Sequence, residues 1–398
     1  MRVLLTSTRG GGHAVPLLPF ARACRDGGLD VLIAGPPPVQ SVAERAGVAF
    51  HRVGEADPER LARVGELLSG KPTMQRVQLA TTELFVGAHG AAALPEMMRL
   101  VGAWRPDVIL RETAEVSSLL SAEAFGVPVV RIGIALATPY EDWWLRMAAD
   151  ALDLLRAEVG VAADPGAGRA ALTPVFTQVP AVLDEHQGDP PVTVRRYRAD
   201  DDAPAPPLPR WWKDAGAPLV PISFGTAVPT DGHYPGLYRA AIDAVAQLPV
   251  RVLVTVGRHA DPAQLGPLPA NVHVERWVEQ ARVMPHAAAL VAHGGAGTTL
   301  AAFAAGVPMA LLPLSADQPL NARHVVALGA GLALGGAADA GRLGALVSAL
   351  LEDHRYRAAA RRVAQEIAEL APVSDAVGEL EALVERDGHA RVRQGVGG

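Results

Sequence analysis

The residues with the clearest chemical potential lie where an apolar run, residues 290–292, leads into glycines and then into a helical pattern. His293 follows the run, and the stretch 294–297, Gly-Gly-Ala-Gly, separates it from Thr298. A glycine turn between a strand and a helix leaves backbone N–H groups free at the positive end of the helix dipole, which suits a phosphate or diphosphate. The segment has neither the GK[ST] of a P-loop hydrolase nor the GxGxxG of a dinucleotide-binding fold. It therefore predicts a diphosphate site, with a turn that serves only packing as the alternative.

A second candidate lies near the N-terminus, where three glycines, residues 10–12, come directly before His13 and a helix predicted over residues 14–26. The positive end of a helix disfavours an imidazolium, so this side chain is expected to be neutral near pH 7 and able to act as a general base. Alcohols and phenols become good nucleophiles only when they lose their proton, which such a base removes. A histidine that only caps the helix explains the residue equally well.

The elements that must position these residues alternate regularly between strands and helices. Apolar strands are expected at residues 2–7, 30–34, 107–110, 127–132, 219–223, 251–256, 272–275, 290–292 and 309–312. Helical patterns fill most of the intervals, and this alternation implies βαβ units on parallel sheets. The fold class is therefore α/β, in two halves of similar size.

Composition and charge set further limits. At about 150 residues per domain, 398 residues predict two to three domains. The net charge of −6, from 36 basic and 42 acidic residues, gives no electrostatic footprint for nucleic acid or anionic lipid. Cys24 is the only cysteine, so no internal disulfide forms. No apolar run reaches the roughly 18 residues of a membrane span, so we expect a cytoplasmic protein without stable membrane insertion.

The spacing around the glycine turn carries a resemblance to a known family. Trp277 and Gln280 lie upstream of it, and the pair Asp317 and Gln318 lies downstream. This pattern resembles the donor-binding signature of the family 1 nucleotide-sugar glycosyltransferases, and within them the bacterial natural-product type that acts on macrolides, enediynes or aromatic polyketides. Their GT-B architecture implies two facing Rossmann-like domains with parallel sheets.

The resemblance implies four parts in the chain. The first is an acceptor-binding domain over residues 1–200, and the second is a proline-rich linker over 201–217. A nucleotide-sugar domain over 218–372 follows, and a C-terminal helix with a frayed tail occupies 373–398.

The resemblance also assigns the ends of the donor. Trp277 would stack on the nucleobase, the backbone near Val278 would hydrogen-bond its edge, and Gln280 would lie near the nucleoside. Asp317 and Gln318 would hydrogen-bond the sugar hydroxyls. Taken alone, Trp277 is better explained as a core aromatic, and an Asp-Gln pair is usually a solvated turn.

The diphosphate in the middle of the donor would be held by His293, Gly295, Gly297 and Thr298. Thr226 follows the first strand of the second half, in a turn that resembles the family's second glycine turn, and would lie near the sugar phosphate. The alternative for His293 is a capping or hydrogen-bonded core histidine.

One departure from the family pattern bears on the donor. Many members have a glutamate three residues after the position of Thr298, where it binds both ribose hydroxyls, but this chain has Ala301. A methyl group accepts no hydrogen bond from a ribose 2′-OH. The resemblance therefore points to a dTDP-deoxysugar rather than a UDP-sugar.

In the N-terminal half, the resemblance favours catalysis by His13, because family members carry their catalytic histidine at this glycine-to-helix turn. They usually orient it with an aspartate just after the fourth or fifth strand. Here residues 108–110 lead into Arg111 and Glu112, so Glu112 takes that place as a longer carboxylate, with Glu115 as the fallback. Arg111 paired with Glu112 in a purely structural ion pair is the alternative.

Aromatic residues further along this half are expected to line the acceptor pocket. Tyr140, Trp143 and Trp144 lie on a segment that often does so in the family. Amphipathic packing explains the three side chains equally well.

Together these features imply an inverting glycosyltransferase that moves a deoxysugar from a dTDP-sugar to a hydroxyl, or a ring carbon, of a hydrophobic natural-product aglycone. The dTDP-sugar is a co-substrate, and no cofactor or metal is expected; His186 beside acidic residues is weak support for a metal. Two other functions stay open, a GT-B nucleotide-sugar epimerase or hydrolase and a non-catalytic homologue. The sequence also leaves a homodimer open.

Overall fold

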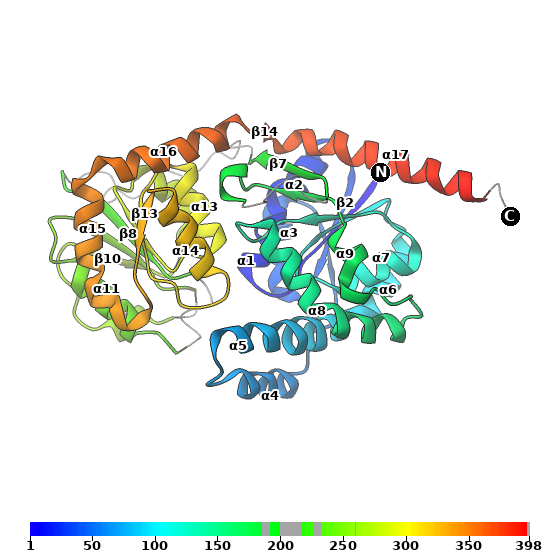
Figure 1. Ribbon diagram of the computed structural model, residues 1–398, viewed down its shortest axis with the longest axis horizontal. Coiled ribbons are helices and arrows are strands. Elements are labelled where there is room, and N and C mark those ends of the chain that lie inside the picture. The colour runs from blue at the N-terminus through cyan, green and yellow to red at the C-terminus, as the bar shows by residue number, and fades with distance from the viewer. Residues whose placement is uncertain (185–191, 200–215, 226–231, 259, 396–398) are drawn as a thin grey trace. The chain divides into compact units, whose positions relative to one another are not determined.

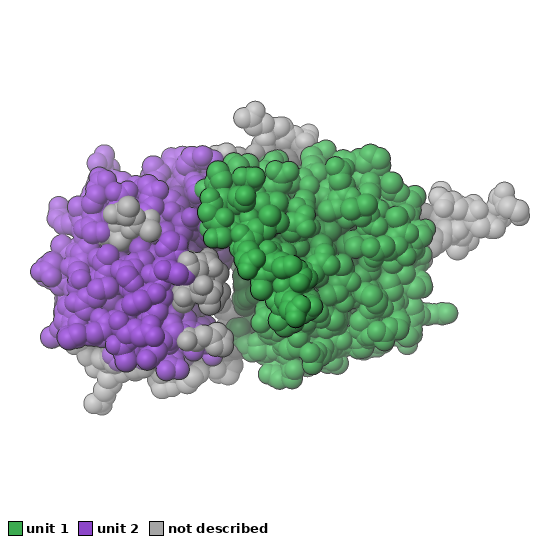
Figure 2. All heavy atoms as spheres, turned by 90° about the horizontal axis from the view of Figure 1, so that it is seen from below, with its two compact units in different colours: residues 1–201, 370–398 green, residues 202–369 purple. Residues whose placement is uncertain are grey.

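The computed structural model describes residues 1–184, 192–199, 216–225, 232–258 and 260–395. The chain divides into two compact units, coloured separately in Figure 2: unit 1 comprises residues 1–201 and 370–398, and unit 2 comprises residues 202–369. The predicted linker, 201–217, lies almost wholly outside the described residues, and Thr226 lies outside them too.

Unit 1 is built on an eight-stranded sheet in which every pair of neighbours is parallel (Figure 1). The strand order is β14-β7-β6-β5-β4-β1-β2-β3, so β4 lies directly beside β1. The strands are β1 (Arg2–Thr6), β2 (Asp30–Gly35), β3 (Ala49–Arg52), β4 (Val108–Glu112), β5 (Val129–Ile132), β6 (Val175–Thr177), β7 (Val194–Arg198) and β14 (Ala371–Pro372).

Helices cover both faces of this sheet. Val3 and Leu5 of β1 belong to a core with α2, α3 and α17, whereas Leu4 belongs to a second core with α6 and α7. Successive side chains of a strand point to opposite faces, so a continuous apolar run is what a sheet covered on both sides requires. The helices are α1 (Gly11–Ala14), α2 (Leu17–Asp26), α3 (Gln40–Ala46), α4 (Pro58–Leu68), α5 (Thr73–Leu79), the π-helix η2 (Ala80–Gly90), α6 (Ala91–Trp104), α7 (Ser117–Phe125), α8 (Thr138–Glu158), α9 (Gly168–Ala171) and α17 (Ala376–Gly395).

Unit 2 repeats the same plan around a six-stranded parallel sheet with the order β10-β9-β8-β11-β12-β13. Its strands are β8 (Leu219–Ser223), β9 (Arg251–Thr255), β10 (Val272–Glu275), β11 (Leu290–Ala292), β12 (Met309–Leu311) and β13 (Gly331–Ala333). Its helices include α11 (Gly236–Val245), α12 (Gln280–Val283), α13 (Ala296–Ala304), α14 (Gln318–Ala327), α15 (Leu343–Glu352) and α16 (His354–Glu369). The α/β class with parallel sheets is therefore confirmed.

The C-terminal segment belongs to unit 1, which corrects the boundaries expected at residues 372 and 373. β14 pairs in parallel with β7, and Leu380 of α17 lies in the core of unit 1. Unit 2 accordingly ends at Glu369. The helical pattern alone could not show this, because only the partners found in the folded chain decide which unit the segment joins.

Two further elements differ from the sequence-based expectation. The helix predicted over residues 14–26 is divided into α1 and α2, and His13 lies inside α1 rather than before a helix. Strand β4 runs on to Glu112, and all five of its residues are buried. Among the described residues, no helix is long and apolar enough to cross a bilayer.

Close helix packing in unit 2 generates a stability prediction. A Cβ atom on Gly344 of α15 would come within 2.4 Å of the carbonyl oxygen of Ala244 in α11, a clash with backbone that cannot rotate away. We expect Gly344→Ala to lower the free energy of unfolding by about 1 to 3 kcal/mol. Gly236→Ala, at the exposed start of α11 with nothing within 4 Å, is the matched control and should be neutral or stabilising. Urea unfolding of both variants measures the difference; equal stabilities would contradict this packing.

Candidate active site

A first candidate site lies in unit 1, where β1 and β4 end. The two strands are parallel neighbours with Thr6 opposite Arg111, so the segments that follow them leave the sheet side by side. Ligands of open α/β sheets bind at this carboxyl edge. Here the Nδ1 atom of His13 lies 3.2 Å from Oε2 of Glu112. The structure thus brings together the two residues that the sequence assigned to acid–base chemistry.

Glu112 is fully buried and is held as a carboxylate. The backbone N–H of Thr8 donates to Oε1 at 3.0 Å, and that of Ala114 donates to Oε2 at 2.6 Å. Burial alone would raise the pKa of Glu112, but the charge of His13 and the hydrogen bonds from His13, Thr8 and Ala114 bring it below its ordinary value. The longer side chain of a glutamate therefore reaches the histidine well.

Arg111 and Glu115, the residues of the two alternative interpretations, bond to other groups in the structure. The Arg111 guanidinium donates to the backbone carbonyls of Glu115, at 2.6 Å, and of Thr113. It therefore shapes the turn after β4 rather than forming a side-chain hydrogen bond with Glu112. The Glu115 carboxylate accepts from the backbone N–H of Ser117 at 3.0 Å and of Ser118 at 3.1 Å, at the start of α7. Glu115 thus stabilises a helix end and is not the partner of His13.

Backbone conformation and an aromatic ring fix His13 itself. Gly10 has a φ of +124°, which side-chain-bearing residues rarely adopt, and it directly precedes α1. The Phe85 ring centroid lies 5.3 Å from that of His13. Because α1 is only four residues long, the helix-dipole effect expected from the sequence is small, and the Glu112 carboxylate is the stronger electrostatic influence on the ring.

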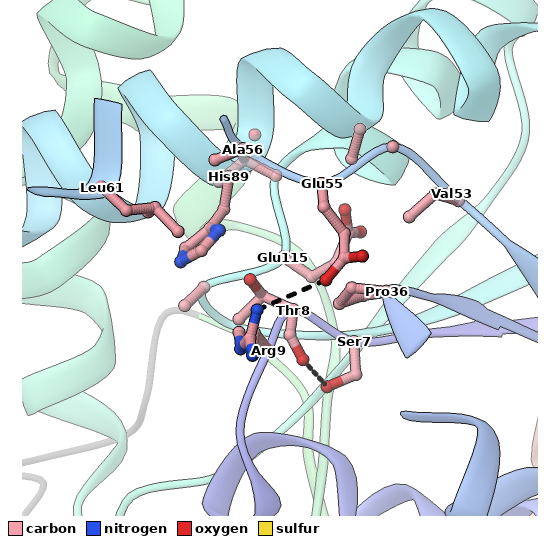
Figure 3. Close-up of a pocket in the computed structure, with 15 residues that line it drawn as sticks. Ser7, Thr8, Arg9, Pro36, Val53, Glu55, Ala56, Leu61, His89 and Glu115 are labelled. Carbon is pink, nitrogen blue, oxygen red and sulfur yellow. Dashed lines mark hydrogen bonds and ion pairs between the residues drawn. The ribbon is translucent and has the colours of Figure 1, made fainter. Parts of the chain in front are cut away.

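A small pocket in unit 1 is lined in part by Thr8 and Ala114, whose N–H groups bond to Glu112 (Figure 3). It lies at the carboxyl edge of the same sheet, lined by the ends of β1, β3 and β4 and by the end of η2. Arg9, Glu55 and His89 contribute its charged and titratable side chains together with the helix-capping Glu115. Sequence reasoning missed all of the first three, because no motif marks them and they come from three separate segments.

The three aromatic residues expected in the acceptor pocket lie on α8 but in different surroundings. Tyr140 and Trp143 have ring centroids 5.5 Å apart and are partly exposed. Trp144 is buried. Its ring centroid lies 6.0 Å from that of Phe85, in an edge-to-face arrangement. Core packing therefore explains Trp144, and its link to the histidine–carboxylate pair runs through Phe85.

A second candidate site, in unit 2, is the glycine turn between β11 and α13. Gly294 has a φ of +85°, and Gly295 is the N-cap of α13. The N–H of Thr299 bonds to the carbonyl of Gly295 at 3.0 Å. The N–H groups of residues 296–298 precede that first helical bond, the position at which helix N–H groups lack a partner within the helix.

His293 is held between two glycines. A Cβ on Gly225 would lie 2.6 Å from its Nε2 atom, and a Cβ on Gly295 would lie 2.5 Å from it. Burial lowers the pKa of His293 to about 4, with a hydrogen bond to the Ser223 backbone opposing the shift. The ring is therefore neutral at pH 7. Within the described chain its Nδ1 atom has no hydrogen-bond partner.

Asp317 and Gln318 stand at the start of α14, close to the glycine turn. Gln318 is buried, and its Oε1 accepts from the N–H groups of Leu314 at 2.8 Å and Ser315 at 3.0 Å. Asn321, to which the sequence assigned no role, donates to the Gly294 carbonyl at 2.8 Å and to Asp317 Oδ2 at 2.7 Å. It therefore joins the two motifs.

The residues expected around the nucleobase lie at the ends of β8, β9 and β10. Trp277 is 43% exposed, and the Arg258 guanidinium lies 4.3 Å from the centroid of its ring. Val278 packs on a core that includes Leu219. Gln280 donates to Ser223 Oγ at 3.0 Å, which ties this segment to β8. An exposed indole with a stacked cation is better suited to a ligand than to the core.

No group of three or more His, Cys, Asp or Glu side chains in the described parts of the chain could hold a metal ion.

Two α/β units, each built on a parallel sheet, are the layout of the GT-B glycosyltransferases. The glycosyltransferase SnogD from Streptomyces nogalater has the same fold, with a TM-score of 0.76, 27% identity, and 96% of this chain and 99% of SnogD covered. Residues 239–383 match the model of the erythromycin biosynthesis protein CIII-like C-terminal domain.

Curated relatives are similar in sequence over nearly the whole chain. It is 32% identical to the L-demethylnoviosyl transferase of Streptomyces niveus, over 92% of this chain and 94% of the relative. It is 27% identical to the TDP-daunosamine transferase DnrS of Streptomyces peucetius, over 100% of both. The chain belongs to the bacterial natural-product glycosyltransferases, so the resemblance is confirmed, and neither an epimerase, a hydrolase nor a non-catalytic homologue is favoured.

The buried His293 makes the stability of the protein depend on pH. Its pKa of about 4 lies below its ordinary value of 6.5, so its contribution is present above pH 6.5 and is lost as the pH falls toward 4. Through this residue we expect the free energy of unfolding to fall by about 2 kcal/mol between pH 7 and pH 5. Urea unfolding of the wild type and of His293→Leu at both pH values measures it. The variant should lack this part of the decrease, and an equal decrease in both proteins would contradict the assignment.

Proposed function

We propose that this glycosyltransferase moves a deoxysugar from a dTDP-sugar to a hydroxyl group of a hydrophobic natural product, with inversion at the anomeric carbon. The observation that carries the proposal is the 3.2 Å contact between His13 Nδ1 and the buried Glu112 carboxylate. A histidine oriented in this way is the arrangement by which enzymes activate a hydroxyl nucleophile.

The geometry supports one assignment of protons. With Glu112 ionised, the Nδ1 atom of His13 carries the hydrogen that it donates, so the neutral ring accepts a proton at Nε2. His13 takes the proton of the acceptor hydroxyl, and the acceptor oxygen forms a bond to the anomeric carbon. The bond from that carbon to the diphosphate oxygen breaks with its electron pair, and dTDP leaves. Glu112 stabilises the imidazolium formed.

Charge that develops on the departing diphosphate is met by unit 2. The N–H groups at residues 296–298, which include those of Gly297 and Thr298, and the positive end of α13 stabilise it. Gly295, the N-cap of this helix, lies beside them. Since His293 is neutral at pH 7, it would contribute a hydrogen bond rather than a positive charge. Thr226 is proposed for the same phosphate from its sequence position.

The rest of the donor is assigned to two further segments of unit 2, one after β10 and one after β12. The thymine would stack on Trp277, beside the Val278 backbone and Gln280, and the sugar hydroxyls would meet Asp317 and Gln318. Ala301 on α13 supports a deoxyribose, because it offers no acceptor to a 2′-OH. The TDP-linked donor in the name of DnrS also supports this choice.

The acceptor is proposed to be an apolar, ring-containing aglycone. Tyr140 and Trp143 offer partly exposed aromatic surface, and one relative is named an elloramycin glycosyltransferase. A base that deprotonates a phenol also activates its ring carbons, so a carbon-linked product is included. The dTDP-sugar serves as co-substrate without a cofactor. We also propose a cytoplasmic protein, in keeping with the buried, unpaired Cys24, and a homodimer as the assembly to be tested by sedimentation.

Removing the base tests the mechanism. His13→Ala and Glu112→Gln are each expected to lower kcat by about 10² to 10⁴-fold, because the hydroxyl is no longer deprotonated or the imidazolium is no longer stabilised. Calorimetric titration should show unchanged dTDP binding, which lies in unit 2. His354→Ala, at an exposed position of α16, is the control for both measurements. Full turnover by His13→Ala would remove it as the base.

The choice of nucleotide is tested by thermal shift with dTDP and UDP at equal concentrations. Tighter binding raises stability by RT ln(1 + [L]/Kd), so tenfold selectivity for dTDP is worth about 1.4 kcal/mol. We expect dTDP to stabilise the wild type more, and Ala301→Glu to improve UDP binding by supplying the missing acceptor. Ala304→Glu, exposed on the same helix, is the control. A wild type that responds to UDP alone would overturn the dTDP assignment.

A further inference from the structure

A second buried carboxylate lies beside the turn that follows β4. Glu141, in the first turn of α8, is 3% exposed and takes no part in the mechanism proposed above. Its Oε1 atom accepts from the backbone N–H groups of Ile134, at 2.6 Å, and Ala135, at 2.8 Å, in the loop after β5. Its Oε2 atom accepts from the Thr113 hydroxyl at 2.6 Å. One side chain therefore joins α8 to the loops that leave two neighbouring strands, β4 and β5.

Charge and hydrogen bonds compensate the burial of Glu141. Burial raises the pKa of Glu141 above its ordinary value, and Arg131 together with the three hydrogen bonds opposes the shift. The Arg131 guanidinium is itself fully buried and lies 3.7 Å from Glu141 Oε2 and 2.6 Å from Asp142 Oδ1. Replacing Glu141 would therefore remove one of the anionic neighbours of a buried cation, a change that endangers the fold itself.

The threonine that Glu141 binds stands inside the turn that orients Glu112. Ala114, directly after Thr113, donates its N–H to Glu112 Oε2 at 2.6 Å. The same oxygen lies 3.2 Å from His13 Nδ1. The peptide group that carries this N–H joins residues 113 and 114, so a fixed Thr113 side chain restricts its rotation. The contact to Glu141 thus acts on the carboxylate oxygen that His13 meets.

Glu141 also lies beside the residues proposed to receive the acceptor. Tyr140 precedes it directly and Trp143 follows two positions later, and both rings are partly exposed. The N–H groups of residues 134–135 belong to the segment that runs from β5 into α8. A link between this segment and the turn after β4 would keep the acceptor hydroxyl and the base at a constant separation, on which the rate of transfer depends steeply.

We propose that Glu141 is a positioning residue for the transfer reaction. Through the Thr113 hydroxyl it holds the turn in which Ala114 binds Glu112, and so keeps that carboxylate in line with His13. The inference rests on the proposed role of His13 as the base. If the turn loosens, the neutral ring can carry its hydrogen on Nε2 instead of Nδ1, and Nε2 then accepts no proton.

The link is best cut at Thr113, because replacing Glu141 would also disturb Arg131. Thr113→Val keeps a side chain of similar shape and removes the donor, whereas Thr113→Ser retains the hydroxyl. Thr138→Val is the matched control. The Thr138 hydroxyl donates at 2.8 Å to Oδ2 of Asp184, another buried carboxylate, at the start of the same helix and outside the turn after β4.

Two readouts are measured for each protein. Nitrogen-15 NMR of protein labelled in its histidine rings gives the share of neutral His13 that carries its hydrogen on Nδ1, and the spectrum of His13→Ala identifies the signal. Steady-state kinetics with dTDP-rhamnose and 2-naphthol give kcat. A merely structural defect reduces the amount of folded protein and leaves the tautomer of the folded molecules unchanged.

Thr113→Val is expected to lower the Nδ1–H share of His13 and to reduce kcat about tenfold, the worth of one hydrogen bond. Both values should largely recover in Thr113→Ser and stay at the wild-type level in Thr138→Val. The proposal is overturned if Thr113→Val keeps the wild-type Nδ1–H share or the wild-type kcat, or if Thr138→Val lowers both as much.

Failure of the proposed function gives different results. A wild type whose neutral His13 carries its hydrogen on Nε2 would refute the proton assignment of that function. A wild type that transfers nothing to 2-naphthol would refute the proposed acceptor class, and the His13 tautomer in Thr113→Val would then decide the positioning role by itself.

Discussion

The burial of a single carboxylate governs the arrangement of unit 1. Glu112 ends a strand whose five residues are all buried, and an unpaired charge there would cost several kcal/mol. It is stable as an anion because Thr8, Ala114 and His13 all donate hydrogen bonds to it. Those donors come from the loop after β1 and the turn after β4, so satisfying one side chain fixes both loops. The contact between His13 and Glu112 is thus one of the three hydrogen bonds that stabilise this buried carboxylate.

In unit 2 the buried titratable side chain is neutral, whereas the buried Glu112 of unit 1 is ionised. His293 is buried between two glycines and kept neutral, and the anion-binding capacity proposed for unit 2 is assigned to the N–H groups at the start of α13. Asn321 donates to the Gly294 carbonyl and to Asp317, so hydrogen bonds join the two motifs. A diphosphate held by oriented dipoles needs no excess of basic residues, which is compatible with a net charge of −6.

Much of this was readable from the sequence because its signals are local. The strand and glycine turn at His293, and the glycines before His13, depend on residues adjacent in the chain. The partner of His13 was also found, although a family pattern rather than spacing selected Glu112. The sequence could not assign roles to Arg111 and Glu115. Each side chain can form hydrogen bonds with several kinds of group, and the sequence does not specify which of these groups lies beside it. Only the folded turn shows which it meets.

The sequence by itself determined the α/β class, the two halves and the two motifs that carry the chemistry, since periodicity and glycine placement encode them directly. The tertiary structure decided what depends on separated segments: the return of α17 to unit 1, the stacking of Arg258 on Trp277, and the meeting of Arg9, Glu55 and His89 in one pocket. These contacts join residues far apart in the chain. Such contacts form only when the folded chain brings these segments together.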